Sequence, residues 1–357
     1  MKKTLALLLV VILVLMAGCS GGSEKTTTAE NTSTEQEAPA EATQAKKETE
    51  EKSFTLKFNC LENEAHAQGQ GVMAFKKKVE ELSNGQITVE PYFSSSLFTQ
   101  EGAITALMSG QLEMTYVAFQ QVAEFYPTAS MFGATYMFKN YEHARKTFDS
   151  EIGKELYENI SNSVNYVPIT AYYNGSRQLN LRTKTPITKP EDLKGTVLRM
   201  PNAASWIAAG ESLGAKVTPL AYAEVYTALQ TGTIDAQDNP LLATKTMNFY
   251  EVTNQISLTY HIIDFGVMSI NKDIWEQMTP KQQEWIYQAA KAAQEVIDGE
   301  QIKAENELIE FFESEGLIIV NPDIEAFRKH SFEYYESKGL TEDWDMDLYN
   351  KIQAMAN

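Results

Sequence analysis

The stretch TVLRMPNAASW (residues 196–206) places an arginine at the end of an apolar run typical of a strand. Pro201 stiffens the turn that follows, and Asn202 belongs to a residue type that caps helices, so a helix is expected to start there. Burying a guanidinium is costly unless a negative group meets it. The stretch therefore predicts that Arg199 pairs with either a protein carboxylate, such as Glu224, or an anionic ligand.

Strands and helices alternate on both sides of this stretch, from Phe54 onward. Strands are predicted at residues 54–60, 86–93, 112–119, 166–173 and 266–270, and helices at 68–85, 100–110, 204–213 and 222–231. A further long helix is predicted from Thr279 as N-cap, Pro280 and Gln282. The alternation predicts an α/β fold with parallel-rich sheets and helices on both faces. Such folds bind ligands beyond the carboxyl ends of their strands.

Composition excludes some classes of partner. The 357 residues include 48 acidic and 30 basic side chains, for a formal charge of -18. That balance argues against nucleic acid and anionic lipid surfaces, whose binding depends on Lys and Arg. It still permits a small anion, because a few arginines in a cleft outweigh distant surface charge. We expect two lobes, because the folded body is large for one α/β unit. The protein is expected to be a monomer.

Motifs for catalysis or cofactor binding are missing from the sequence. There is no G-x-S-x-G, H-E-x-x-H, Walker or C-x-x-C motif, and the GQG at residues 69–71 lacks the third glycine of a dinucleotide loop. The four histidines are scattered without metal-ligand spacing. The sequence predicts a protein that is not an enzyme and uses no cofactor or metal.

The N-terminus has the pattern of an export signal. Lys2 and Lys3 precede an apolar stretch of about 14 residues, which is signal-peptide length. The stretch ends in LMAGC, which resembles a bacterial lipobox, so residues 1–18 are expected to be a signal peptide and Cys19 to be lipidated. The alternative is an uncleaved anchor with an accidental cysteine. Residues 19–53 lack a folding pattern and are interpreted as a disordered linker to the membrane, whereas Cys60 is expected to be buried.

Ordered blocks in the body resemble a known family. LRMPNAA (198–204), LGAKVTPLAYAEVYTALQTG (213–232), DAQDNP (235–240) and FYEV (249–252) are similar to blocks of the DctP-type solute-binding subunits of TRAP transporters. The resemblance implies a two-lobed, flytrap-like periplasmic-binding-protein fold. It implies lobe I at 54–174, lobe II at 175–264, a return to lobe I at 265–304, and C-terminal helices at 305–357 that pack on lobe II and span both lobes.

The same resemblance implies a function and a site. The chain is expected to capture a small organic acid outside the cytoplasm and deliver it to the small and large membrane subunits of the transporter. Arg199 would grip the ligand carboxylate, and Asn239 would donate its amide to the same group. The remaining expected ligand-binding residues are Arg177, Tyr222 and Asn202.

Alternatives remain open for three of these residues. Arg177 could form a structural ion pair, Asn239 could form an Asx turn before Pro240, and Tyr222 could pack in the core. A ligand-sensing module for a membrane receptor and an extracellular enzyme are the competing functions.

In the first lobe, sialic-acid-binding members carry Glu and Arg where this chain offers Ala118 and Gln121. A carboxylate smaller or more apolar than sialic acid is therefore expected, with Tyr116, Phe119 and Gln120 as candidate contacts.

Overall fold

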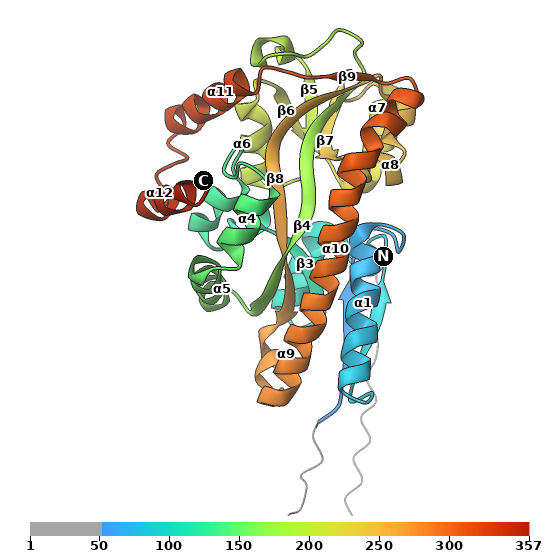
Figure 1. Ribbon diagram of the computed structural model, residues 1–357, viewed down its shortest axis with the longest axis vertical. Coiled ribbons are helices and arrows are strands. Elements are labelled where there is room, and N and C mark those ends of the chain that lie inside the picture. The colour runs from blue at the N-terminus through green and yellow to red at the C-terminus, as the bar shows by residue number, and fades with distance from the viewer. Residues whose placement is uncertain (1–51, 357) are drawn as a thin grey trace, which may run out of the picture. The chain divides into compact units, whose positions relative to one another are not determined.

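A computed structural model describes residues 52–356, and within them nine strands form one mixed sheet (Figure 1). The strand order is β2-β1-β3-β8-β4-β7-β5-β6, and β9 pairs with β8. The strands are β1 (Phe54–Asn59), β2 (Ile87–Tyr92), β3 (Met114–Ala118), β4 (Tyr166–Leu181), β5 (Val197–Met200), β6 (Lys216–Pro219), β7 (Ala236–Pro240), β8 (Gln255–Asn271) and β9 (Ile318–Val320).

Helices connect most of these strands. The helices are α1 (Ala67–Leu82), α2 (Gln100–Met108), α3 (Phe119–Val122), α4 (Tyr141–Phe148), α5 (Glu151–Ser163), α6 (Ala204–Ser212), α7 (Val225–Thr231), α8 (Leu241–Thr246), α9 (Lys272–Glu276), α10 (Pro280–Ser314), α11 (Ile324–Ser337) and α12 (Met346–Ala354). Short 3-10 turns occur at Pro127–Gly133, Pro190–Leu193, Tyr222–Glu224 and Phe249–Val252. None of the helices in residues 52–356 combines the length and apolarity needed to cross a bilayer.

Two long antiparallel strands, β4 and β8, run through both ends of the sheet (Figure 1). The C-terminal part of β8, from Gly266 to Ile270, pairs with β3. The N-terminal part of β8 pairs with β9, and the C-terminal part of β4 pairs with β7. We call the strands β1 to β3 the first strand group and β5 to β7 the second strand group. The long strands therefore connect the two groups.

The expectation of a parallel-rich sheet is only partly correct. Pairs β1–β2, β1–β3, β5–β6, β5–β7 and β8–β9 are parallel, but β3–β8, β4–β8 and β4–β7 are antiparallel. The sequence pattern was read as a strand ending at Tyr173, whereas β4 continues to Leu181. Gly175 explains the misreading: its φ of 109° bends the strand, and a Cβ there would lie 2.7 Å from Pro240 Cβ.

Separate apolar clusters stabilise the two strand groups. In the first group, Phe58 of β1 packs edge-to-face on Phe75 of α1, with ring centroids 5.9 Å apart. In the second group, Leu198 and Trp206 lie in a cluster with Phe327 of α11. Cys60 is fully buried in the first cluster, as the sequence predicted. Cys19, the expected signal peptide and nearly all of the expected linker lie outside the described residues.

Two predicted helix starts have different outcomes. The capping box of Thr279 and Gln282 is confirmed, with Pro280 at the first helical position of α10. The predicted cap by Asn202 is wrong, because Ala203 holds the N-cap position of α6 with extended dihedrals (φ -152°, ψ 149°). Asn202 therefore precedes the cap and is exposed.

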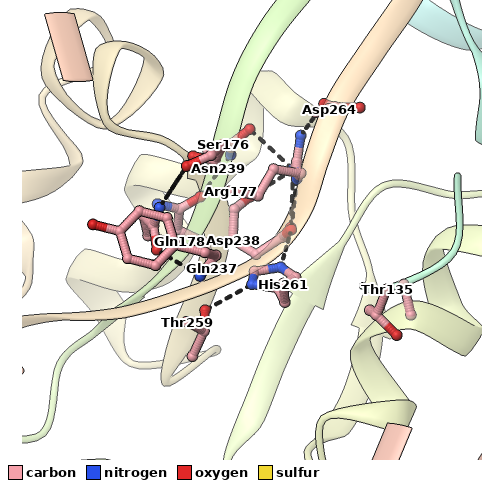
Figure 2. A network of polar contacts seen from close by, with 12 residues as sticks. Thr135, Ser176, Arg177, Gln178, Gln237, Asp238, Asn239, Thr259, His261 and Asp264 are labelled. Carbon is pink, nitrogen blue, oxygen red and sulfur yellow. Dashed lines mark hydrogen bonds and ion pairs between the residues drawn. The ribbon is translucent and has the colours of Figure 1, made fainter. Parts of the chain in front are cut away.

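A buried ion-pair network ties β4, β7 and β8 together (Figure 2). Arg177 of β4 makes a bidentate pair with Asp238 of β7, with Nε–Oδ2 at 2.6 Å and Nη2–Oδ1 at 3.0 Å. Its Nη1 donates to Asp264 Oδ2 of β8 at 3.0 Å. His261 of β8 also contacts Asp238, with Nε2 and Oδ2 3.1 Å apart. Each of these side chains is almost fully buried, so the network depends on its own complementary charges.

The long helix α10 packs along α1 and β4 (Figure 1), and two of its carboxylates, one buried and one half-buried, hold it to β4. Asp298 accepts the Tyr173 backbone N–H at 2.7 Å, the Tyr141 hydroxyl at 2.9 Å and Arg145 Nη2 at 2.6 Å. About two turns further along α10, Glu305 accepts the Tyr173 hydroxyl at 2.6 Å. These contacts lie beside the bend of β4, so α10 supports the segment that joins the strand groups.

Removing the Asp298 carboxylate should destabilise the protein strongly. Asp298→Ala leaves Arg145, whose side chain is 12% exposed, without its buried partner. Breaking such a pair typically costs about 3–5 kcal/mol, which urea unfolding would measure. The matched control is Asp149→Ala, because Asp149 is the other partner of Arg145 but is 53% exposed. That change should cost less than about 1 kcal/mol, and equal losses for both variants would contradict the assignment.

The Arg177–Asp238 pair should make stability depend on pH in a defined direction. Burial alone would raise the pKa of Asp238, but the Arg177 charge and the His261 contact hold that pKa well below its usual range. A depressed folded-state pKa means that the stabilisation is full above the unfolded value of about 3.9 and is lost as the pH falls below it. The free-energy difference between wild type and Asp238→Asn should therefore shrink from pH 6 to pH 3.

Urea unfolding at several pH values checks this expectation. Asp235→Asn is the control. Asp235 is 47% exposed, and its ion pair with Arg182 is weak because the two charged atoms are 4.0 Å apart. Its difference from wild type should be small at every pH. If the difference in unfolding free energy between wild type and Asp238→Asn stays constant down to pH 3, the ion pair does not set the pH dependence.

Candidate functional site

A cavity that opens to solvent lies between the two strand groups, beside the bend of β4. Residues from both groups line it, so each contributes one side of the site. The polar residues of the lining are Asn59, Glu62, Gln68, Gln100, Thr115, Tyr116, Gln121, Tyr172, Asn174, Arg177, Arg199, Trp206, Tyr222, Asn239 and Asp264. Polar side chains that converge on one cavity in this way suit a small-molecule ligand.

Arg199 brings an unneutralised positive charge to this cavity. It lies on β5 and is 1% exposed, and its Nε donates to the Leu220 carbonyl at 2.8 Å. No carboxylate of residues 52–356 lies within 4.0 Å of its guanidinium, and Glu224 is exposed. Burial lowers the pKa of Arg199 to about 10, so the group stays charged at neutral pH. The alternative of a pair with Glu224 is therefore wrong.

Arg177 also lines the cavity, but its charge is already neutralised. Asp238 and Asp264 occupy its guanidinium, and the Trp206 ring lies 4.3 Å from its central carbon. Burial would lower the pKa of Arg177, but the two carboxylates raise it above its ordinary value. The geometry favours the structural ion pair that the sequence left open, and a direct ligand contact by Arg177 stays a prediction.

Asn239 and Tyr222 lie on the cavity wall near Arg199. The Asn239 amide donates to Gln237 Oε1 at 2.6 Å, and its oxygen accepts Arg177 Nη2 at 3.2 Å. One amide hydrogen is left for another acceptor. The Tyr222 ring packs edge-to-face on Phe249 and lies 5.9 Å from the Arg199 guanidinium carbon. Tyr222 thus lines the cavity and packs against the protein at once.

Other expected contacts are divided between the cavity and its surroundings. Tyr116, Ala118 and Gln121 line the cavity. Phe119 does not, because it stacks on Phe148 in the apolar core. Gln120 is also absent from the lining and donates to the Gly133 carbonyl at 3.3 Å. Asn202 is exposed and lies outside the lining, because α6 begins after it.

Several lining residues were not predicted from the sequence, and Glu62 and Trp206 are two of them. Glu62 lies between β1 and α1 in the polar run LENEA, which is typical of a solvated loop, yet it is 6% exposed. Trp206 follows the quoted turn by a few residues, and its indole nitrogen is buried without a protein hydrogen-bond partner. A tryptophan on an apolar helix face gives no sign that it borders a cavity, so neither residue carried a usable signal.

The chemistry of the cavity fits binding. Within residues 52–356 no group of three or more His, Cys, Asp or Glu is placed to hold a metal ion. Burial raises the pKa of the Cys60 thiol far above neutrality, so it is not a nucleophile. The pronounced feature is a buried guanidinium with free donors, which is suited to a carboxylate.

Comparisons with known proteins agree with this geometry. The family model described as bacterial extracellular solute-binding protein, family 7 (DctP) matches residues 58–340. The chain is 31% identical over 304 residues to the sialic acid-binding periplasmic protein SiaP of Vibrio cholerae, covering 84% of this chain and 92% of that protein.

Solved structures of TRAP periplasmic solute-binding proteins have the same fold. One from Roseobacter denitrificans, with bound 3-deoxy-D-manno-oct-2-ulosonic acid, superposes with a TM-score of 0.81 at 34% identity. That match covers 85% of this chain and 99% of the other. Another from the same organism, with bound L-galactonate, has a TM-score of 0.78 at 28% identity and covers 86% and 99% of the two chains.

These matches confirm the family resemblance, the periplasmic-binding fold and a non-enzymatic role in solute binding outside the cytoplasm. The family model spans the residues that build the cavity, including Arg199 and Asn239. The chain therefore belongs to the DctP family of bacterial extracellular solute-binding proteins.

Proposed function

We propose that this chain binds a small organic acid and that Arg199 clamps its carboxylate. The observation that carries the proposal is the buried Arg199 guanidinium, whose only protein hydrogen bond in the described residues leaves from Nε. Its two terminal nitrogens can present a planar fork of donors to a carboxylate. Such a ligand would supply the missing counter-charge in a desolvated site, where an ion pair is strong.

The ligand class that fits best is a hydroxylated sugar acid. The relatives named above bind sialic acid, an octulosonic acid and L-galactonate. In this chain, Asn59, Gln68, Thr115, Gln121 and Asn174 give the cavity many groups that can hydrogen-bond hydroxyls. This lining favours a hydroxylated acid over the more apolar one expected from the sequence. Asn239 has one amide hydrogen left for the ligand.

The proposal extends to delivery and anchoring. The captured acid would be handed to the small and large membrane subunits of a TRAP transporter, as the family implies. Lobes at 54–174 with 265–304 and at 175–264 would close on the ligand, and residues 305–357 would brace them. Lipidation of Cys19 would hold this protein, as a monomer, at the membrane face through the linker of residues 19–53.

Substituting Arg199 tests the clamp. Arg199→Ala should weaken binding of an aldonate or ulosonate by about 2–5 kcal/mol, because the ligand carboxylate would be buried without a counter-charge. Arg199→Lys keeps the charge but loses the planar fork, so its loss should be intermediate. Isothermal titration calorimetry with L-galactonate and 3-deoxy-D-manno-oct-2-ulosonate measures both effects.

Arg182→Ala is the matched control for this experiment. Its side chain is 37% exposed and lies outside the cavity, so the variant loses the same charge without touching the site. It should bind like wild type. If Arg199→Ala retained wild-type affinity for every acid that binds, the carboxylate clamp would be ruled out.

A further inference from the structure

A second unpaired charge lies in the same cavity, on Glu62. The side chain is 6% exposed, and its Oε2 is buried with no hydrogen-bond partner in the described part of the chain. No lysine, arginine or histidine of residues 52–356 lies within 4.0 Å of its carboxylate. Native proteins rarely leave a buried carboxylate without a cation, so the absence of a cationic partner points to an external donor.

The loop between β1 and α1 holds Glu62 in place. The Glu62 carbonyl accepts the Ser94 backbone N–H at 2.9 Å. Asn63 Oδ1 accepts the backbone N–H groups of Ala65 and His66 at 3.0 and 3.1 Å. Gly69 allows the loop to lie against α1, because a Cβ there would be 2.2 Å from the Asn63 carbonyl oxygen. The position of the carboxylate is therefore built by the fold.

Tyr222 lies within reach of both unpaired charges. Its ring lies 5.9 Å from the Arg199 guanidinium carbon, and its buried hydroxyl faces the Glu62 carboxyl. Burial raises the pKa of Tyr222, and the Glu62 carboxyl raises it further. The cavity therefore holds a free guanidinium and a free carboxylate, with a phenol that interacts with both.

The charged side chains of the lining determine which functional groups a ligand must carry. Arg177, Asp238 and Asp264 are paired with one another, so each of the three has a partner within the protein. Arg199 and Glu62 remain, and they do not pair with each other within 4.0 Å. A ligand that satisfies both must present a carboxylate to Arg199 and a hydrogen-bond donor to Glu62.

Resting on the proposed function, we infer that Glu62, together with Tyr222, forms a second subsite that reads the far part of the acid. It accepts a hydrogen bond from a hydroxyl or an ammonium group of the ligand. A second carboxylate at that place would face the Glu62 charge in a desolvated cavity, where like charges repel each other. The chain therefore selects hydroxy or amino monocarboxylates and rejects the matching dicarboxylates.

Ligands that share one skeleton test this selection. Gluconate, 6-amino-6-deoxygluconate and glucarate differ only in the group at carbon six, which is a hydroxyl, an ammonium or a carboxylate. Threonate, 4-amino-4-deoxythreonate and tartrate form the corresponding four-carbon series. Calorimetric titration of the purified full chain with each acid gives the ratio of monocarboxylate to dicarboxylate affinity. The amine and hydroxyl arms show which donor the subsite prefers.

Glu62→Gln removes the charge with little change in shape, and Glu64→Gln is its matched control on the exposed part of the same loop. Wild type and Glu64→Gln should bind the monocarboxylate at least about tenfold more tightly than the dicarboxylate. In Glu62→Gln the ratio should fall to within about threefold, and any preference for the amine should disappear. Thermal unfolding should show Glu62→Gln to be at least as stable as wild type, because a buried unpaired charge has been removed.

The outcomes separate this inference from the function on which it rests. An unchanged ratio in Glu62→Gln, or a wild type that binds the dicarboxylate as tightly as the monocarboxylate, overturns the inference. If wild type binds these acids and Arg199→Ala does not, the proposed function survives even when the inference about Glu62 fails. If wild type binds no carboxylic acid of either series or of the sugar acids named above, the proposed function fails and the inference fails with it.

Discussion

A buried guanidinium must meet a negative group, and this structure treats its two cavity arginines in opposite ways. Arg177 is held by Asp238 and Asp264 within one network that joins three strands. Arg199 lies on β5, which pairs with β7. It is as buried as Arg177, but its only side-chain hydrogen bond within residues 52–356 is from Nε to the Leu220 carbonyl. The difference separates structure from function. One charge stabilises the sheet, and the other costs folding free energy and, under the proposed function, meets the carboxylate of a ligand.

The paired arginine also positions the unpaired one. Asp238 lies on β7, which pairs with both β4 and β5, so the Arg177–Asp238 contact fixes the register beside Arg199. The Trp206 ring covers the Arg177 guanidinium and links this network to α6, the helix that follows β5. The ion-pair network thus supports the cavity wall from behind. The rest of the lining depends on it because β4, β7 and β8 all contribute residues to that wall.

The amino-acid sequence predicted the parts of the site that local patterns report. Arg199 was predicted because a charge ended an apolar strand, and Cys60 and the Thr279 cap were predicted from equally local signals. The antiparallel pairs of β4 and β8 could not be read, because strand direction depends on partners more than 80 residues away, as in the pairing of Arg177 with Ile262. Asn202 was predicted to cap α6, but the helix cap is one residue later, at Ala203. Local residue preferences do not locate a helix start to a single residue.

Glu62 shows why binding specificity is harder to predict than a clamp. Nothing in LENEA distinguishes a buried carboxylate from a solvated one, because Glu62 faces Tyr222, which lies about 160 residues away in the sequence and lines the same cavity. Arg199 and Glu62 therefore belong to opposite sides of the cavity. A ligand that contacts both joins the two strand groups, whereas a ligand that contacts only Arg199 does not. Recognition of the far end of the acid and closure of the site would then be the same physical event.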